Sequence, residues 1–269
     1  MDQGEVSFGG SVAEGYRDYL EPVIFRPWAE LLVDFVGVEP AQSVLDVAAG
    51  TGVVSRAAAG RVRAAGKVIA SDVSGAMLAQ VPNGFPDDVS LQTVECSATA
   101  LDLPDASVDV VFCQQGLQFV PDRAQAAKEM HRVLRPGGKA GISVWLSSPR
   151  VEPFIVYGEA LQAAQVPEPF PGAYDSSSLS MDTDEVEGVL NAAGFEQITL
   201  SVEQLVLPWP SVLHAVRGAF GTPYGPVIDA LDKATRESVL ADVERRMSDA
   251  ASQARSTVMT SILARGSRA

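Results

Sequence analysis

Short apolar, β-branched runs alternate with helix-forming segments through the first 150 residues of the chain. The runs predict five strands, at residues 43–47, 67–71, 90–95, 108–113 and 139–145. Helix-forming segments lie between them, at 53–65, from near Ser74 onward, and at 122–134. Strands that alternate with helices at this spacing predict right-handed crossovers and a parallel sheet.

The pattern changes after residue 149, where Pro, Gly and aromatic residues become dense. We expect insertions at 151–175 and 208–224 to cap the core. The later elements are predicted as a helix at 182–193, a strand at 196–206, a helix at 226–247 and a strand at 256–264. The expected parts of the chain are an N-terminal helical lid (1–40), a ligand-binding core (41–148), a continuation of the core with substrate-capping insertions (149–225), and a last helix and strand (226–269).

The composition is that of a globular protein with a strongly acidic surface. Of the 269 residues, 46% are hydrophobic and 20% are charged, which is enough to build a substantial core. The 20 basic and 34 acidic residues give a net charge of −14, and a field of this sign repels nucleic acids and anionic membranes as partners. No signal-peptide pattern is present, and no apolar run reaches the roughly 18 residues of a membrane span, so we expect a cytoplasmic protein.

Metal-ligating and nucleophilic side chains are scarce. Two cysteines and two histidines suffice for neither a disulfide framework nor a zinc site, so we expect no metal. The chain also lacks Gly-x-Ser-x-Gly, His-Glu-x-x-His and Cys-x-x-Cys motifs. Hydrolases and metalloenzymes therefore have no support in the sequence.

The strongest signal is a glycine-rich turn at residues 44–53, Val-Leu-Asp-Val-Ala-Ala-Gly-Thr-Gly-Val. A buried strand enters this turn and a helix leaves it, so small residues let the main chain approach a ligand while exposed N–H groups face it. Asp72 follows Gly50 by 22 residues, at the end of the next strand, where a carboxylate accepts hydrogen bonds from ribose hydroxyls. The pair predicts a ligand with a ribose rather than a ligand-free turn.

The charge beside the turn discriminates between two such ligands. Asp46 stands at the end of the strand that enters the turn, where a carboxylate repels a pyrophosphate and attracts a cation. S-adenosylmethionine carries an ammonium and a sulfonium and has no phosphate. The sequence therefore favours S-adenosylmethionine over NAD.

Four pieces of the chain resemble, in order and spacing, those of class I S-adenosylmethionine-dependent methyltransferases. They are residues 45–52 (Leu-Asp-Val-Ala-Ala-Gly-Thr-Gly), 70–78 (Ala-Ser-Asp-Val-Ser-Gly-Ala-Met-Leu), 103–109 (Leu-Pro-Asp-Ala-Ser-Val-Asp) and 133–138 (Val-Leu-Arg-Pro-Gly-Gly). The resemblance covers residues 10–147 well and is to the small-molecule branch, which includes ubiquinone/menaquinone-biosynthesis-like and natural-product-tailoring enzymes. It implies an α/β fold with a Rossmann-like, seven-stranded, mostly parallel sheet, helices on both faces, and an α-helical cap.

The same resemblance implies a set of cofactor contacts. Asp46, Ala48 and Gly50 would line the methionine moiety, and Asp72 would hold the ribose. The remaining implied contacts are Val73 and Met77 on the adenine faces, the main-chain N–H of Ala98 on the adenine ring, Gln114 at the methionine end, and Tyr16 closing over the cofactor. Ser97 departs from the family pattern, which commonly has an aspartate there, so we expect a weaker or water-mediated contact with adenine.

Candidates for the acceptor pocket lie near the ends of the fourth and fifth strands and in the cap. Trp145 ends the fifth strand, Gln115 and Gln118 follow the fourth, and Trp209 lies in the cap. Core packing is the alternative for the aromatic residues, whereas a glutamine amide in an apolar loop requires a partner. His214 is the one candidate general base, and a histidine that is exposed or packed in a helix is the alternative.

Methyl transfer from a sulfonium is a one-step displacement that needs alignment and a desolvated pocket more than acid or base. We expect a methyltransferase that acts on an oxygen or carbon nucleophile of a hydrophobic small molecule (a polyketide, quinol or other secondary metabolite), with S-adenosylhomocysteine as product. A natural-product cyclase that binds S-adenosylmethionine without transferring its methyl fits the same motifs, and a non-catalytic binding module is a third alternative. The aromatic residues near the N-terminus fit either a homodimer contact or a lid.

Overall fold

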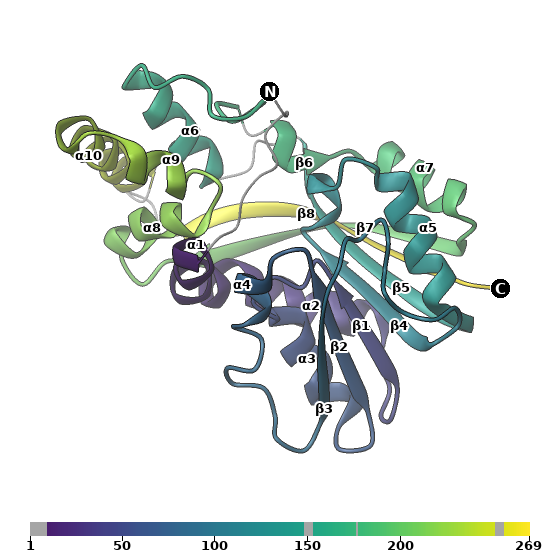
Figure 1. The fold of residues 1–269 in the computed structure, drawn as a ribbon. Coiled ribbons are helices and arrows are strands. Elements are labelled where there is room, and N and C mark those ends of the chain that lie inside the picture. The colour runs from purple at the N-terminus through teal and green to yellow at the C-terminus, as the bar shows by residue number, and fades with distance from the viewer. Residues whose placement is uncertain (1–9, 148–152, 176, 251–255) are drawn as a thin grey trace.

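The computed structural model describes residues 10–147, 153–175, 177–250 and 256–269, which build one twisted sheet with helices around it (Figure 1). Its strands are β1 (Ser43–Val47), β2 (Lys67–Asp72), β3 (Ser90–Glu95), β4 (Val108–Gln114), β5 (Leu134–Leu146), β6 (Ser180–Met181), β7 (Glu196–Pro208) and β8 (Ser256–Ser267). Seven strands follow the order β3-β2-β1-β4-β5-β8-β7, and the short β6 pairs with β5 outside this path. β8 runs antiparallel to β5 and β7, and the other described pairings are parallel.

The strand order places a ligand site at one edge of the sheet. β1 and β4 lie side by side in the middle, with β2 and β3 on one side of them and β5 on the other. The carboxyl ends of these parallel strands meet at the same edge, and α/β sheets bind ligands where the strand order reverses, which here is between β1 and β4. The predicted architecture, a mostly parallel sheet with helices on both faces and a helical cap, is confirmed.

Helices cover both faces of the sheet. α2 (Arg26–Val36) and α3 (Val53–Val62) pack on one face, and α5 (Arg123–Val133) and α7 (Thr183–Ala193) pack on the other (Figure 1). Successive strand residues point to opposite faces, so Val110 and Phe112 enter the core under α2 and α3. Val111 lies in the core under α5 and α7. The short α4 (Gly75–Leu78) follows β2 at the ligand edge.

The N-terminal segment is helical from Gly10 to Val36, in the three pieces α1 (Gly10–Gly15), η1 (Tyr16–Phe25) and α2. η1 has the wide turns of a π-helix, and Pro22 lies inside it. Proline has no N–H to donate and its ring crowds the preceding turn, which accounts for the widening. η1 nevertheless buries Leu20 and Ile24 and so packs firmly against the rest of the protein.

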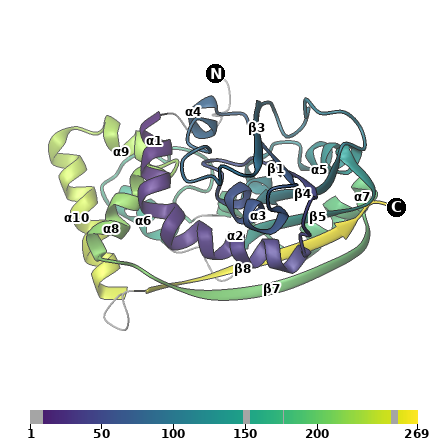
Figure 2. The same cartoon turned by 90° about the horizontal axis from the view of Figure 1, so that it is seen from below.

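A second group of helices lies together at one end of the molecule (Figure 1). Its members are α6 (Phe154–Ala163), α8 (Val212–Gly218), η4 (Ala219–Gly221), α9 (Gly225–Ala230) and α10 (Lys233–Ala250). All but α6 are inserted between β7 and β8, which pair from Glu196 and Ser267 to Pro208 and Ser256. Figure 2 shows these two strands running as a ribbon from the core to the cap helices. The remaining short elements are η2 (Leu117–Phe119) and η3 (Ser177–Leu179).

Several predicted boundaries are wrong. The helix expected at 226–247 is two helices, because Leu231 is extended and the Asp232 carboxylate accepts hydrogen bonds from the first N–H groups of α10 at 3.0 and 3.1 Å. The fifth strand begins at Leu134 rather than at 139, with a shift of register opposite Val108 to Val110. The helix after the glycine-rich turn ends at Val62 because Arg63 has a positive φ of 59°. Of the N-terminal lid expected at 1–40, residues 1–9 lie outside the described part.

Among the described residues, no helix is long and apolar enough to cross a membrane. The same part of the chain contains no group of three or more His, Cys, Asp or Glu side chains that could hold a metal ion.

Candidate active site

The glycine-rich turn between β1 and α3 has an open side. Ala48, Gly50 and Gly52 have positive φ angles of 53°, 54° and 85°, so the main chain bends sharply over a few residues. A Cβ on Gly52 would lie 2.7 Å from Cγ1 of Val81, whereas a Cβ on Gly50 would meet nothing within 4 Å. The turn therefore packs on its Gly52 side and leaves main-chain atoms accessible at Gly50, which is what close approach of a ligand requires.

Asp72 joins the end of β2 to this turn. Its Oδ2 accepts a hydrogen bond from the Gly50 N–H at 2.9 Å, and its Oδ1 accepts one from the Ser74 N–H at 2.8 Å. Burial raises the pKa of this carboxyl above its ordinary value, although the two N–H groups oppose the shift. Each oxygen of a carboxylate has room for a second donor, so Asp72 retains acceptor capacity for the hydroxyls of a ribose.

The neighbouring apolar side chains form a surface beside Asp72. Val73 is 74% exposed, an unusual position for a large apolar side chain, and it directly follows the carboxylate. Met77 is buried in a small cluster with Val12 and Ala13, against which Tyr16 packs. These positions fit a flat aromatic group such as adenine, which would cover Val73 while its ribose reached Asp72.

Asp46 lies at the end of β1 and is fully buried. Its Oδ2 accepts hydrogen bonds from the N–H and the hydroxyl of Ser55 at 2.9 and 2.7 Å. Burial raises its pKa to about 7, and the nearby charge of Asp72 acts in the same direction. Asp46 thus orients the first turns of α3, and a cation in the site would restore its charge at neutral pH.

Tyr16 lies over the same edge of the sheet. Its ring stacks on Phe25 with the centroids 4.5 Å apart. Burial raises the pKa of its hydroxyl well above the ordinary value, and the charges of Glu21, Asp46 and Asp72 raise it further. The tyrosine therefore stays protonated as a hydrogen-bond donor among three carboxylates, in the place where the sequence predicts it to close over a cofactor.

Glu21 was not predicted as a site residue, yet it connects the N-terminal helix to the turn. The carboxylate is 3% exposed, and its Oε2 accepts a hydrogen bond from the Thr51 hydroxyl at 2.6 Å. Its Oε1 accepts one from the Arg56 guanidinium at 2.5 Å, and the same guanidinium donates to the Thr51 carbonyl at 2.8 Å. An acid inside the apolar stretch 20–25 is the signal that identifies it, because a buried carboxylate requires partners.

Ser97 and Ala98 follow the end of β3, beside Asp72. The Cys96 N–H donates to the Asp72 carbonyl at 3.0 Å, which holds this segment against β2. The Ser97 hydroxyl lies 2.8 Å from that of Thr99 and accepts a hydrogen bond from the Thr99 N–H at 3.2 Å. Ser97 is exposed, and its hydroxyl has a second lone pair that can accept from an adenine amino group if it donates its own proton to Thr99.

The end of β4 lies directly against the glycine-rich turn. A Cβ on Gly116 would come 2.7 Å from Cβ of Ala48, so the two segments approach as closely as main chains can. Gln114 and Gln115, just before this contact, are both buried, and Gln115 has a positive φ of 50°. The amide of Gln114 donates to the Phe25 carbonyl at 3.0 Å, which brings η1 to the same place.

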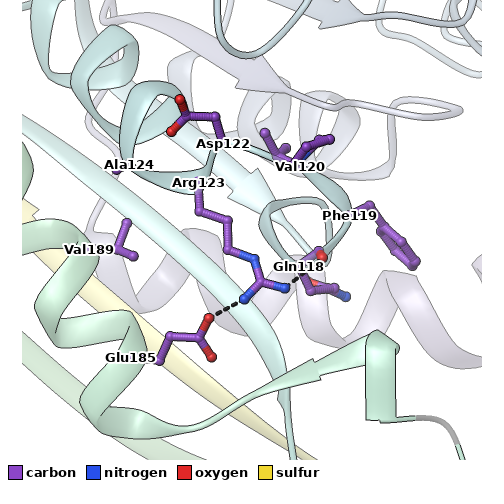
Figure 3. Close-up of a pocket in the computed structure, with 9 residues that line it drawn as sticks. Gln118, Phe119, Val120, Asp122, Arg123, Ala124, Glu185 and Val189 are labelled. Atoms are coloured by element: carbon purple, nitrogen blue, oxygen red, sulfur yellow. Dashed lines mark hydrogen bonds and ion pairs between the residues drawn. The ribbon is translucent and has the colours of Figure 1, made fainter. Parts of the chain in front are cut away.

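Gln118 borders a separate surface pocket of about 670 Å³, shown in Figure 3. Arg123 bridges part of the pocket, since its guanidinium donates to the Gln118 carbonyl at 3.0 Å and pairs with Glu185 of α7. The pocket lies between α5 and α7, whereas the glycine-rich turn leads into α3 on the opposite face of the sheet. It is therefore not the cofactor site. The Gln118 side chain is buried, and both of its amide atoms lack a partner among the described residues.

Trp145 is buried in an aromatic cluster at the end of β5. Its ring lies 5.8 Å from that of Trp28, 6.1 Å from Phe25 and 6.4 Å from Phe154. Core packing accounts for this position. The ring cluster of Phe25, Trp28, Trp145 and Phe154 fills the space between the N-terminal helices and α6. Its predicted contact with an acceptor stays a prediction.

His214 and Trp209 lie further out, in the cap. The Nε2 of His214 is 3.0 Å from the Tyr19 carbonyl, and because a carbonyl can only accept, this nitrogen carries the proton. The imidazole also packs against the Tyr19 ring at 5.2 Å and the Trp209 ring at 6.0 Å. These contacts attach α8 to η1, and the predicted role of His214 as a general base is untested.

The predicted cofactor residues therefore converge at one edge of the sheet. Of the predicted acceptor residues, Gln115 lies with them and the others divide among three further places. Those near the cofactor turn are Tyr16, Asp46, Ala48, Gly50, Asp72, Val73, Met77, Ser97, Ala98, Gln114 and Gln115. Trp145 lies in the adjoining core, Trp209 and His214 lie in the cap, and Gln118 borders the pocket between α5 and α7.

Comparisons with known proteins agree with this geometry. Residues 45–142 match the methyltransferase domain family. The ubiquinone/menaquinone biosynthesis C-methyltransferase UbiE of Hahella chejuensis is 39% identical over 137 residues, which are 48% of this chain and 54% of that enzyme. The UbiE of Yersinia pestis (strain Pestoides F) is 30% identical over 207 residues, 71% of this chain and 82% of that enzyme.

The fold is also found among solved structures. Phosphoethanolamine N-methyltransferase 2 of Haemonchus contortus, in complex with S-adenosyl-L-methionine, superposes with a TM-score of 0.58 at 16% identity. The superposition covers 96% of this chain and 56% of that protein, and at this identity it shows a shared fold alone.

Proposed function

Because this chain belongs to the class I S-adenosylmethionine-dependent methyltransferases of the ubiquinone/menaquinone-biosynthesis-like group, we propose that its acceptor is a hydrophobic small molecule. The methyl group would go to an oxygen or carbon nucleophile of a quinol, a polyketide or another secondary metabolite. S-adenosylmethionine, when bound, supplies a methyl group activated by the adjacent sulfonium. The chain itself has to bind the two reactants, align them and exclude water.

One observation supports the proposed placement of the cofactor above the others. The open main chain at Gly50, the acceptor oxygens of Asp72 and the exposed apolar side chain of Val73 follow one another along the sheet edge. In this order, the three features match the amino-acid end, the ribose and the flat adenine of S-adenosylmethionine. Tyr16, half-buried beside them and protonated, would close the site against water.

The proposed class of acceptor rests on the aromatic cluster between the N-terminal helices and α6. Phe25, Trp28, Trp145 and Phe154 lie in ring contact there, under the cap helices. A charged acceptor would lose its hydration in such surroundings, whereas an aromatic or polyketide-like molecule gains by burial. The net charge of −14 argues in the same direction against anionic acceptors.

A calorimetric titration with S-adenosylmethionine and with S-adenosylhomocysteine tests the site. We expect micromolar affinity for both, and a loss of affinity by about 5- to 150-fold in Asp72→Ala if the carboxylate holds the ribose. Asp184→Ala, which removes an exposed carboxylate from α7, is the matched control and should bind normally. Unchanged affinity in Asp72→Ala would show that the cofactor site is elsewhere.

Release of S-adenosylhomocysteine then distinguishes the proposed function from its alternatives. A methyltransferase forms one equivalent of it for each labelled methyl group that reaches a quinol or phenol. A cyclase on this fold would convert its substrate with the cofactor unchanged, and a binding module would do neither. Sedimentation of the same samples tests the homodimer that the aromatic N-terminal segment allows.

A further inference from the structure

Four buried polar side chains lie together at the carboxyl ends of β4 and β5, in an otherwise aromatic region. Gln114 and Gln115 are 8% and 6% exposed, and Ser143 and Ser261 are fully buried. Gln114 is the register partner of Ser143, and the Gln115 N–H donates to the Ser143 carbonyl at 2.8 Å. Phe25 joins the group through its carbonyl, which accepts from Gln114. The four side chains thus form one polar patch inside the core.

The contacts determine which way each amide points. The Phe25 carbonyl can only accept, so the NH₂ group of Gln114 must face it, at 3.0 Å. Ser261 donates its hydroxyl proton to the Val144 carbonyl at 2.8 Å and therefore accepts from the NH₂ group of Gln115, also at 3.0 Å. Both amides thus direct their Oε1 atoms away from these partners, and neither oxygen has a hydrogen bond among the described residues.

Two buried amide oxygens without hydrogen-bond donors lower the stability of the fold. A buried acceptor without a donor destabilises a protein, and an apolar side chain of similar shape would avoid the loss. Gln115 adds backbone strain, because a residue with a Cβ is disfavoured at its φ of 50°. Strained residues and unpaired buried groups of this kind cluster at functional sites.

The patch adjoins the place where the two reactants would meet. Gly116, the next residue, approaches Ala48 of the glycine-rich turn, so the main chain that carries the two glutamines runs up to the proposed methionine end of the cofactor. From there the Gln115 amide reaches across β5 to Ser261 of β8. The two amide NH₂ groups donate hydrogen bonds to a main-chain carbonyl and to a serine hydroxyl, and both of these partners are uncharged. A ligand that binds this patch has to donate hydrogen bonds to the two Oε1 atoms, and it does not need a charge to do so. The buried Ser143 hydroxyl, which also lacks a partner among the described residues, is available to a neighbouring ligand oxygen.

We propose that the Oε1 atoms of Gln114 and Gln115 accept hydrogen bonds from hydroxyl groups of an uncharged acceptor, and so select a hydroxylated ring over its methyl ether. This inference rests on the proposed function, since it assigns the acceptor end of the same site. It names two specificity residues and the hydroxyl donors by which they would recognise a neutral acceptor.

Catechol and its dimethyl ether veratrole are suitable ligands for the test, because they share a ring and differ only in their donors. Protein saturated with S-adenosylhomocysteine is titrated with each by calorimetry. We expect catechol to bind about tenfold more tightly, the effect of one or two hydrogen bonds, although the extra methyl groups of veratrole would favour it by burial alone. In Gln115→Leu and in Gln114→Leu this preference should fall to about threefold or less.

Gln204→Leu is the matched control. Gln204 also donates its amide to a hydroxyl of β8, that of Thr260 at 3.3 Å, but it is exposed on β7 away from the turn. It should keep the preference of the wild type. In the ligand-free state, Gln115→Leu should melt close to the wild type, because it removes an unpaired acceptor together with the hydrogen bond to Ser261.

Equal affinity for catechol and veratrole in the loaded wild-type protein would overturn the inference and leave buried water as the partner of the two oxygens. Failure of the loaded protein to bind catechol would overturn it as well. Both outcomes differ from failure of the proposed function, which appears earlier as absence of S-adenosylhomocysteine binding.

Discussion

Glu21 is the residue whose alteration tests most directly how the N-terminal helix is held on the cofactor turn. Its buried carboxylate accepts from the Thr51 hydroxyl at 2.6 Å and from the Arg56 guanidinium at 2.5 Å. Glu21→Gln preserves the size of the side chain and removes its charge. Glu21→Ala removes both contacts and leaves a cavity.

The expected loss follows from what each partner retains. Removing one member of a buried ion pair costs about 3–5 kcal/mol when the other is left without compensation. Arg56 is 17% exposed and keeps its hydrogen bond to the Thr51 carbonyl at 2.8 Å, so the cost must be lower. We expect about 2 kcal/mol for Glu21→Gln and about 3 kcal/mol for Glu21→Ala. The first value corresponds to a fall in Tm of about 4–8 °C for a chain of this size.

Urea denaturation gives the free energy of unfolding, and calorimetry gives the affinity for S-adenosylmethionine. The affinity should also fall, because Tyr16 lies about one π-helical turn before Glu21 on the same helical segment. Glu30→Gln is the control, since Glu30 pairs with Arg61 at 3.2 Å on the exposed surface and should contribute about 0.5 kcal/mol or less. A loss for Glu21→Gln no larger than that of the control would refute the reasoning.

Three further predictions concern the turn and its neighbours. Asp72→Asn keeps an acceptor but cannot supply two carboxylate oxygens, so S-adenosylmethionine should bind about 5- to 30-fold more weakly by calorimetry; equal binding would contradict the ribose contact. The folded protein keeps the Asp46 proton up to about pH 7, whereas an unfolded aspartate loses it near 3.8, so Asp46 lowers stability as pH rises between these values. Denaturation of Asp46→Asn from pH 4 to 8 should accordingly show a flatter profile than wild type, and an identical profile would rule the shift out. Gly116→Ala places a methyl 2.7 Å from Cβ of Ala48 and should cost about 1–3 kcal/mol in urea, whereas Gly60→Ala, with nothing within 4 Å, should be neutral or stabilising.

The parts of the molecule that the sequence predicts are those whose signals are local. The strand at 43–47, its glycine-rich turn and the following helix are adjacent in sequence, and Asp72 ends the neighbouring parallel strand. Parallel strands bring their carboxyl ends to one edge, so the turn and Asp72 had to meet once the strands were recognised. Strand periodicity, the glycine-rich motif and the resemblance to a known family were together sufficient for this half of the site.

The rest depends on packing between distant segments, which no local pattern specifies. Glu21 reaches Thr51 and Arg56 across 30 and 35 residues, by way of a helix whose orientation follows from the turns around Pro22. The same helix accounts for His214, whose partner is a main-chain carbonyl 195 residues away. The break between α9 and α10 was also missed, because a single aspartate at a helix start is a weak signal within an otherwise helical composition.

The ribbon of β7 and β8 has a consequence for how such a chain can change over time. The two strands stay paired as far as Pro208 and Ser256, so the polypeptide leaves the sheet and returns to it at neighbouring positions. The entropy of closing a longer insertion grows only with the logarithm of its length, and the ends are held together whatever lies between them. Insertions at exposed loops between these two ends should therefore have little effect on β1, β2 and the turn between them, as long as the side chains that pack on η1 are kept. Mutation and selection can thus vary the loops at the tip of the ribbon while the strands that carry the glycine-rich turn are inherited unchanged.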